Sequence, residues 1–549
     1  MIVRFRGREG TYRIEASQEQ SFAQIVGDLA KQLPQGSLRF SSSPSSAPTG
    51  YDAGWEKTLQ QLGISHGDMI FFELHETERP AEAAHATPLP RQQAPTHPKQ
   101  SRSSLVVPHA VDVALATQPG KIRRPRSKLC RHGEKGMCEY CSPLEPYDEE
   151  YRISQGIKHL SLWAHINKVQ SSELIAPCYE VKDCTKHAPF PASICSACQP
   201  QPITLQQQKF RIVDHVEFAS SHIMNNFVEY WRQTNSQRAG FLIGEYCEYP
   251  LVPLGVKAVV HAIWEPPQTD SLDGICINEL NVPVNVEKAA NSLGLGVVGV
   301  IYTDIVDACA GDGSVVCKRH ANSYFMSSQE VVFSAKLQRS HPNYNTLAAD
   351  GVFGSKFVTC IVSGNDHNQI DVACYQVSIA AESLVAADIV EPSVNPSIMR
   401  VKKRTPTRFI PEVSYKQVGQ HGNTVQKPGI PSFPTDYLLV SLSHGFSEAK
   451  NLIISEFPIE NRPQILGQTQ SRLAAQLELR DGFTSDKMAD FHLLAYLFST
   501  STLNLEEEKL VTKLLALELG NGESSEIVDV ATKLAYSDGL VTLRMLAEA

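Results

Sequence analysis

Eight cysteine and histidine residues between positions 130 and 198 have the types and spacing of metal ligands. They form two groups of four, each with three sulfurs and one imidazole: Cys130, His132, Cys138 and Cys141 in the first, and Cys184, His187, Cys195 and Cys198 in the second. Three thiolates and one imidazole complete a tetrahedral zinc site, whereas catalytic zinc usually keeps one position open. The sequence therefore predicts two structural zinc ions.

The second group leaves one alternative open, because Cys178 lies close enough in the sequence to replace Cys184. Disulfides are a poorer interpretation of these cysteines. The N-terminus, from Met1 to Arg6, has no apolar core of a signal peptide. The remaining cysteines are scattered singly in apolar segments, which is typical of reduced thiols in the cytosol or nucleus.

A second set of residues has the spacing of a metalloprotease motif. A glycine-bracketed strand, Gly240–Gly244, is followed by a buried strand that ends in Tyr302-Thr303-Asp304 and later by Ser327-x-x-Glu330. This order resembles the MPN (JAMM) domain of zinc isopeptidases. Active members place a Glu before the first strand, a His-x-His pair at the second and an Asp at the end of the serine motif. In those enzymes the two His and the Asp bind zinc, and the Glu activates water.

In this chain the matching positions hold Tyr302, Asp304 and Glu330, and residues 236–238 before the first strand include no carboxylate. A phenol and two carboxylates are a poor tetrahedral zinc set. The sequence therefore predicts an inactive MPN segment that keeps only the groove where ubiquitin lies. The alternatives are an unrelated α/β domain with a chance glycine-rich strand, and a zinc-dependent JAMM deubiquitinase.

A chain of 549 residues should hold several domains, and the first lies at residues 1–75. Short alternating strands, a helix over Ser21–Leu33 and a last strand at Met69–Phe72 are expected there. The order of these elements, with Leu62-Gly63-Ile64 and His66-Gly67-Asp68 before the last strand, resembles a ubiquitin-like β-grasp domain. Another small α+β module is the alternative. A β-grasp domain has no active site, so we expect it to dock on another protein.

Residues 76–120 are rich in Pro, Ala, Gln and Ser, which predicts a flexible linker. The basic run Lys121–Lys128 follows. It is either a nuclear-import or nucleic-acid patch or a solvated strand leading into the zinc site, and the acidic chain favours the strand. Residues 121–207 would hold the paired zinc modules, joined by a helix over His159–Val169.

The sequence predicts its largest α/β segment at residues 208–400. It predicts a helical C-terminal domain at residues 401–549. Within the first, we expect a helix over Ser221–Thr234 and sheet strands at Gly296–Asp304, Phe325–Glu330 and Phe357–Ser363. Within the second, Asn504 and Glu507 have the spacing of a capping box for a helix that runs to Leu519.

The overall charge and hydropathy argue against two classes of partner, nucleic acids and membranes. The net charge is −9, so a nucleic-acid-binding zinc protein is a weaker interpretation. No apolar run approaches the roughly 20 residues that span a bilayer, so we expect no membrane span.

Together, the β-grasp start, the two zinc groups, the ligand-poor MPN segment and Phe433–Phe446 (FPTDYLLVSLSHGF) resemble one family over nearly the whole chain. It is the nuclear protein localization protein 4 family. The resemblance implies a multidomain α+β fold and the two zinc sets named above. It also implies a non-enzymatic substrate adaptor located in the cytoplasm and nucleus, and peripherally at the endoplasmic reticulum and nuclear envelope through its partners.

The resemblance further implies a heterodimer with ubiquitin fusion degradation protein 1. That pair recruits polyubiquitinated proteins to the hexameric AAA ATPase called valosin-containing protein, for unfolding or extraction before proteasomal degradation. The ubiquitin-like domain and the zinc modules would dock on the ATPase, and the MPN and helical regions would hold the chain. Some relatives end in a further ubiquitin-binding zinc finger. No cysteine follows Cys374 here, so we expect chain binding to rest on the MPN and helical regions.

Overall fold

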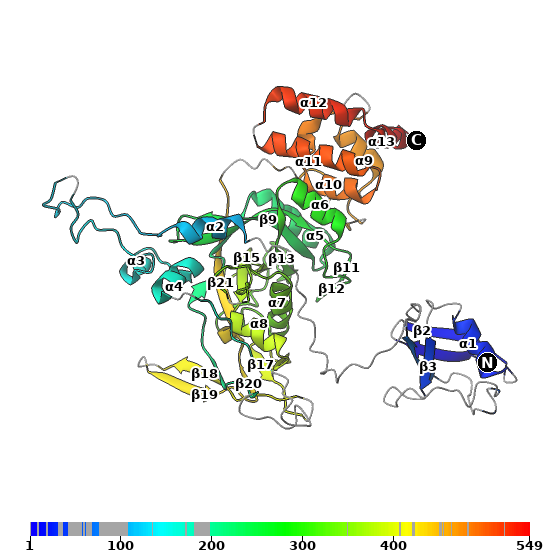
Figure 1. Ribbon diagram of the computed structural model, residues 1–549, viewed down its shortest axis with the longest axis horizontal. Coiled ribbons are helices and arrows are strands. Elements are labelled where there is room, and N and C mark those ends of the chain that lie inside the picture. Colours follow the sequence, from blue (N-terminus) through cyan, green and yellow to red (C-terminus); the bar gives the residue numbers. More distant parts are fainter. Residues whose placement is uncertain are drawn as a thin grey trace, which may run out of the picture. The chain divides into compact units, whose positions relative to one another are not determined.

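The computed structural model describes most of the chain in two compact units, residues 1–102 and 103–549 (Figure 1). The described residues are 2–7, 10–17, 20–30, 37–41, 58, 61, 69–75, 108–133, 136–170, 173–180, 198–348, 350–405, 408–419, 423–448, 453, 455–462, 464–479, 483–520 and 522–548. Within them no helix is both long and apolar enough to cross a membrane.

The first unit is a four-stranded sheet with one helix. Its elements are β1 (Ile2–Gly7), β2 (Gly10–Glu15), α1 (Phe22–Ala30), β3 (Ser37–Ser41) and β4 (Met69–His75). The sheet order is β2-β1-β4-β3, with β1 and β4 parallel in the centre and antiparallel strands on both sides. Phe5 and Phe22 are fully buried, with ring centroids 6.4 Å apart, so the helix packs on the sheet.

A closed barrel forms the centre of the second unit. Its strands are β8 (His215–Phe218), β9 (Ala239–Tyr249), β10 (Gly255–Trp264), β13 (Gly296–Asp304), β14 (Val358–Gly364), β15 (Ile370–Val377) and β21 (Leu439–Phe446). They follow the order β10-β8-β21-β15-β14-β13-β9. Gly244 and Gly299 lie where a Cβ would collide with the backbone of a neighbouring strand, which explains the glycines of this segment.

Strand β21 corrects the expected boundary at residue 400. Residues 401–549 were expected to be helical, yet β21 pairs antiparallel with β15 and parallel with β8. Val440 and Leu442 are buried and Ser441 and Ser443 are exposed, so the segment alternates with the period of a strand. The barrel closes only with this late segment.

Helices cover the barrel and extend from it. They are α2 (Ala110–Thr117), α3 (Glu149–Ser154), α4 (Leu162–Val169), α5 (Ser221–Thr234), α6 (Val284–Ser292), α7 (Ser328–Ser340) and α8 (Ile379–Ala386). The helix expected over Ser221–Thr234 is confirmed. The strand expected at Phe325–Glu330 is wrong, because Ser327 caps α7 and Ser328–Glu330 form its first turn.

Helix α2 lies inside the segment 76–120 that was expected to be a flexible linker. Val111, Asp112 and Leu115 are buried against the barrel, so residues 110–117 are part of the second unit. Residues 76–107 lie outside the described part of the chain. The linker-like composition of this segment did not indicate helix α2, whose stability comes from tertiary packing.

Short sheets surround the barrel. Their strands are β5 (Leu160–Ser161) with β7 (Phe210–Arg211), β6 (Ile203–Leu205) with β18 (Val413–Val418) and β19 (Thr424–Pro428), β11 (Gln268–Asp270) with β12 (Ile275–Ile277), and β16 (Val390–Pro392) with β17 (Ile398–Val401) and β20 (Ser432–Pro434). Strands β18 and β19 form a projecting hairpin (Figure 1), and every residue of β19 is exposed.

The last part of the chain is helical from Gln470 onward. Its helices are α9 (Gln470–Gln476), α10 (Phe491–Ser499), α11 (Leu505–Leu519), α12 (Ser524–Ala535) and α13 (Asp538–Glu548), drawn in orange and red in Figure 1. The capping box at Asn504 and Glu507 is confirmed. One hydrophobic cluster joins this bundle to α6 and to Phe241 and Trp264 of the barrel.

Candidate metal centre and acidic pocket

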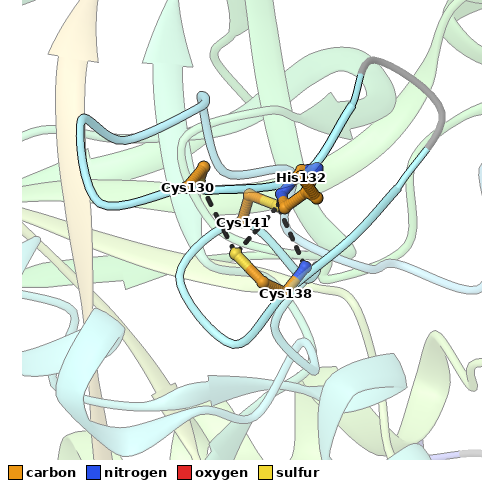
Figure 2. Close-up of side chains that lie close together, drawn as sticks. All are labelled: Cys130, His132, Cys138 and Cys141. Carbon is orange, nitrogen blue, oxygen red and sulfur yellow. Dashed lines mark hydrogen bonds between the residues drawn. The ribbon is translucent and has the colours of Figure 1, made fainter.

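The first Cys/His group is assembled as a compact cluster (Figure 2). The ligand atoms of Cys130, His132, Cys138 and Cys141 all lie within 4.8 Å of one another. Cys138 Sγ is 3.6 Å from Cys130 Sγ and 3.8 Å from Cys141 Sγ. A tetrahedron with zinc–sulfur bonds of about 2.3 Å has sulfur–sulfur edges of about 3.8 Å. The cluster therefore fits a structural zinc ion.

Hydrogen bonds orient two of these ligands toward a common centre. His132 Nδ1 lies 2.9 Å from the Gly133 carbonyl oxygen, which leaves Nε2, 3.1 Å from Cys141 Sγ, to face the cluster. The backbone N–H of Cys138 donates to Cys141 Sγ at 3.4 Å and is the largest cause that lowers the pKa of Cys141 to about 7. A metal ligand must be a thiolate, so this shift favours binding.

The basic run Lys121–Lys128 supports the same loop. Arg124 Nε donates to the Ser142 carbonyl at 2.8 Å, and Arg124 and Arg126 also bind the backbone carbonyls of Glu139 and His132. These bonds agree with the interpretation of this run as a segment leading into the zinc site.

The second Cys/His group falls almost entirely outside the described residues. Cys184, His187 and Cys195 lie in residues 181–197, and only Cys198, which is buried, is described. Cys178 lies in a different setting, on a segment fixed to the barrel. Ser383 Oγ donates to the Pro177 carbonyl at 2.5 Å, and Cys178 lines a pocket beside α8. The choice between Cys178 and Cys184 as a ligand of the second group stays a prediction.

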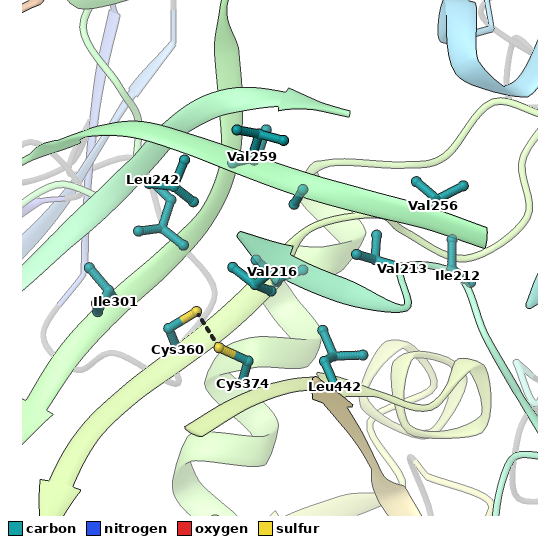
Figure 3. Close-up of a cluster of buried hydrophobic side chains, with 14 of the residues drawn as sticks. Ile212, Val213, Val216, Leu242, Val256, Val259, Ile301, Cys360, Cys374 and Leu442 are labelled. Carbon is teal, nitrogen blue, oxygen red and sulfur yellow. Dashed lines mark hydrogen bonds between the residues drawn. The ribbon is translucent and has the colours of Figure 1, made fainter. Parts of the chain in front are cut away.

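Two cysteines expected to lie singly are in fact neighbours. Cys360 on β14 is opposite Cys374 on β15, with sulfur atoms 3.2 Å apart inside the barrel core (Figure 3). Both are buried and free. Sequence separation hid this contact, because antiparallel strands pair residues whose spacing depends on the length of the connecting turn.

The three residues at the metalloprotease positions come together around a fourth that the sequence did not single out. Arg319 Nε lies 3.0 Å and Nη2 2.8 Å from Asp304 Oδ2. Its Nη1 and Nη2 lie 2.9 Å and 2.6 Å from the two oxygens of Glu330. Tyr302 is next to this cluster, and burial followed by the charge of Glu330 raises its pKa. A guanidinium thus sits between the two carboxylates.

Electrostatics match this arrangement. Burial alone would raise the pKa of Asp304, but the charge of Arg319 and the bond from Lys318 Nζ, 3.0 Å away, outweigh it and lower that pKa. Burial would lower the pKa of Arg319, but its bonds to Glu330 outweigh that effect and raise it. The Asp304 carboxylate is therefore ionised, and Arg319 and Lys318 neutralise its charge within the protein.

The residues before the glycine-bracketed strand serve other purposes. Gln237 is 4% exposed; its Nε2 donates to the Leu272 and Ile305 carbonyls at 2.8 and 2.7 Å, and its Oε1 accepts from Thr303 Oγ1 at 2.8 Å. Arg238 turns away to Glu265, 2.6 Å from Nε to Oε2. Residues 236–238 thus place no carboxylate where the water-activating Glu of active MPN enzymes is expected.

A pocket of about 530 Å³ opens over this cluster. Gln237, Tyr302, Asp304, Arg319 and Glu330 form its polar side. Ile275, Ile277, Leu280, Val300 and Phe333 form its apolar side, and the first two belong to β12. Among the described strands β12 pairs only with β11, so its other edge has no strand partner there.

Comparisons with known proteins agree with this geometry. A model of the NPL4 family matches residues 238–547, and a model of the zinc binding region of that family matches residues 106–235. The chain is 42% identical to Nuclear protein localization protein 4 of Yarrowia lipolytica over 558 residues, which cover 96% of this chain and 98% of that protein. It is 38% identical to Nuclear protein localization protein 4 of Saccharomyces cerevisiae over 587 residues and the full length of both.

The chain belongs to the NPL4 family.

The zinc binding region of the NPL4 family extends across both Cys/His groups and also includes α2. The assembled first group and this match together support zinc as the bound metal. The relatives named above are named as localization proteins and not as enzymes. The chain is a mixed α+β multidomain protein with a zinc-binding region, as expected from the sequence.

Arg319 and Gln237 were not predicted from the sequence as residues of this site. One signal was present for Arg319. Two carboxylates at the floor of a pocket need a cation, and residues 318 and 319 are the basic pair that lies between Asp304 and Glu330 in the sequence.

Proposed function

We propose that this NPL4-family protein is a non-enzymatic adaptor that binds polyubiquitin chains. With ubiquitin fusion degradation protein 1 as its heterodimer partner, it would deliver ubiquitinated proteins to a valosin-containing AAA ATPase for unfolding before proteasomal degradation. The observation that carries the proposal is the occupied acidic cluster. A pocket of about 530 Å³ stands open, while Asp304 and Glu330 bind Arg319 and residues 236–238 supply no carboxylate to activate water.

The shape of the pocket suits an extended protein segment. The edge of β12 offers main-chain donors and acceptors, and Ile275, Ile277 and Phe333 offer an apolar wall. Addition of a strand to a sheet edge is a common way to hold an extended peptide. Binding without cleavage is what an adaptor requires, and this supports the inactive MPN assignment of residues 208–400, extended by β21.

The zinc loop supports a docking role. Leu129, Met137 and Tyr140 are exposed around the first cluster, and a zinc site gives a small loop the rigidity that a small core cannot supply. The four-stranded first unit supports the ubiquitin-like assignment of residues 1–75, and residues from 470 form the helical domain of the proposal. Two docking modules on one chain, residues 1–75 and the zinc loop, raise the effective concentration of each module at the partner. The names of the relatives support a nuclear involvement, and a cytoplasmic location is part of the proposal.

The proposal is tested with purified full-length protein of measured metal content and tetra-ubiquitin, followed by pull-down and by gel. We expect bound, uncut chains and two zinc ions per protein. Chains cut in a chelator-sensitive reaction would instead support a JAMM deubiquitinase. Absence of binding, alone and with the heterodimer partner added, would refute the adaptor proposal.

A further inference from the structure

Arg319 joins three separate pieces of backbone at the acidic pocket. It binds Asp304 at the end of β13, Glu330 in the first turn of α7, and the Phe325 carbonyl between them, 2.9 Å from Nη1. Its side chain is only 5% exposed. A residue that connects a strand end to a helix start in this way positions both walls of the pocket.

All three guanidinium nitrogens of Arg319 are occupied by these partners. Nε binds Asp304, Nη1 binds Glu330 and Phe325, and Nη2 binds both carboxylates. The ring of Tyr324 adds a cation–π contact at 5.3 Å. Arg319 therefore has no donor directed at a ligand, and its contribution is to the protein itself.

Two carboxylates that converge at the floor of a pocket are ordinarily the ligands of a hard divalent cation. Here the side chains of Asp304 and Glu330 are 23% and 20% exposed, so solvent reaches them only in part. Without a cation they would repel each other in a partly desolvated site. The guanidinium supplies the charge that a bound metal would supply.

We propose that Arg319 is a built-in replacement for a metal ion. It holds β13 against α7 and fixes the acidic wall of the pocket. It also prevents Asp304 and Glu330 from binding divalent cations. The planar guanidinium fork can bind two carboxylates and a carbonyl at once, whereas a Lys ammonium is a point charge. Arg319→Lys should therefore keep the positive charge but lose the simultaneous contacts to the two carboxylates and the Phe325 carbonyl.

The decisive variant is Arg319→Ala in the full-length protein, tested with Mn²⁺ and with ethylguanidinium. Removing the guanidinium leaves two paired carboxylates exposed to solvent, so we expect a new Mn²⁺ site by electron paramagnetic resonance. We also expect a lower thermal midpoint that millimolar ethylguanidinium raises again. Tetra-ubiquitin affinity should fall about tenfold, because the acidic wall of the pocket is no longer held in place.

Two control variants separate this role from a general loss of stability. Asp304→Asn/Arg319→Met/Glu330→Gln keeps neither carboxylate of the cluster, so it should neither bind Mn²⁺ there nor respond to ethylguanidinium. Arg232→Ala removes an exposed arginine of α5 paired only with Glu229, and should behave as the wild type.

The ubiquitin measurement rests on the proposed function, but the metal and rescue measurements do not. If wild-type protein fails to bind chains both alone and with the heterodimer partner, the adaptor proposal is wrong, and Mn²⁺ binding by Arg319→Ala still tests the replacement. The replacement is overturned if Arg319→Ala gains no Mn²⁺ site, or if ethylguanidinium stabilises it no more than it stabilises the triple variant.

Discussion

At the scale of single residues, Ser327 and Glu330 show how one short motif can be interpreted in two ways. Their spacing matches the end of the metalloprotease motif, and it is also the spacing of a capping box. Ser327 Oγ accepts from the Glu330 N–H at 3.3 Å, and Glu330 Oε2 accepts from the Ser327 N–H at 2.7 Å. The capping role alone accounts for both residue types, so the motif is weak support for a metal site.

The Cys/His cluster is the residue-scale feature with the most direct consequence. Cys138→Ser removes the sulfur that lies within 3.8 Å of two other ligand sulfurs, so we expect the first zinc module to unfold and the zinc content to fall by about one ion per chain. Elemental analysis measures the loss. Under the proposed function, docking on the ATPase should weaken, while ubiquitin binding by residues 216–549 should remain.

Cys309→Ser is a matched control, because Cys309 is exposed and lies outside both the cluster and the lining of the acidic pocket. If Cys138→Ser keeps the wild-type zinc content and docks normally, the ligand assignment is wrong.

Glu382 makes stability depend on pH. It is 8% exposed, and burial raises its pKa to about 7 from an ordinary value of 4.5, against the opposing bond from Gln338 and the charge of Arg339. Because the folded protein binds this proton more tightly, the contribution of Glu382 to stability falls as pH rises from about 4.5 to about 7. Glu382→Gln should therefore stabilise the protein by up to about 3 kcal/mol at pH 8 and by much less at pH 5.

Urea unfolding of both proteins at the two pH values measures this difference. A gain in stability of Glu382→Gln that is equal at pH 5 and pH 8 would contradict the assignment.

At the scale of elements, α2 depends on one buried ion pair. Asp112, 3% exposed, binds Lys356, 2% exposed, and accepts a hydrogen bond from Trp163 Nε1 at 3.2 Å. Lys356 also binds Asn343. The pair therefore connects α2 and α4 to the segment that leads into β14.

Asp112→Asn should destabilise the second unit by about 3 kcal/mol, because it leaves the Lys356 ammonium buried without a counter-charge. Denaturant unfolding measures the loss, and increased proteolysis between residues 103 and 121 would locate it at α2. Asp112→Leu/Lys356→Met removes both charges and should recover much of the stability. A double variant as unstable as the single one would show that packing, and not charge, limits α2.

At the scale of the whole molecule, a second buried cluster connects the barrel to the segment that leads into the helical bundle. Glu265 is fully buried and binds Arg238, the residue before β9, 2.6 Å from Nε to Oε2, and Arg462, 2.9 Å from Nε to Oε2. Both guanidinium groups lie over the Tyr230 ring, at 4.4 and 5.3 Å. Asn461 and Arg462 also bind backbone carbonyls of Glu265 and Asn226.

Glu265→Gln should lower the thermal midpoint and separate the unfolding of the helical bundle from that of the barrel, because two buried cations lose their shared carboxylate. Calorimetry would show two transitions in place of one. Lys288→Gln breaks a more exposed pair with Glu508 between α6 and α11 and should change the profile little. A single, merely shifted transition for Glu265→Gln would show that the hydrophobic contacts alone couple the two parts.

The features that follow from the sequence are those that depend on local spacing. The first zinc set, the helix at Ser221–Thr234 and the capping box at Asn504 and Glu507 each involve residues close together in the chain, and periodicity or ligand chemistry is enough to predict them. The family resemblance added the global arrangement, which no local pattern contains.

Other features required the tertiary structure, because they pair residues whose separation follows no local rule. Strand β21 enters the barrel between β8 and β15, and its alternation predicts a strand but not its neighbours. Arg319 meets Asp304 and Glu330 only because the chain loops back between β13 and α7. The sequence could show that the metalloprotease ligands were missing, and only the folded chain could show which cation stands in their place.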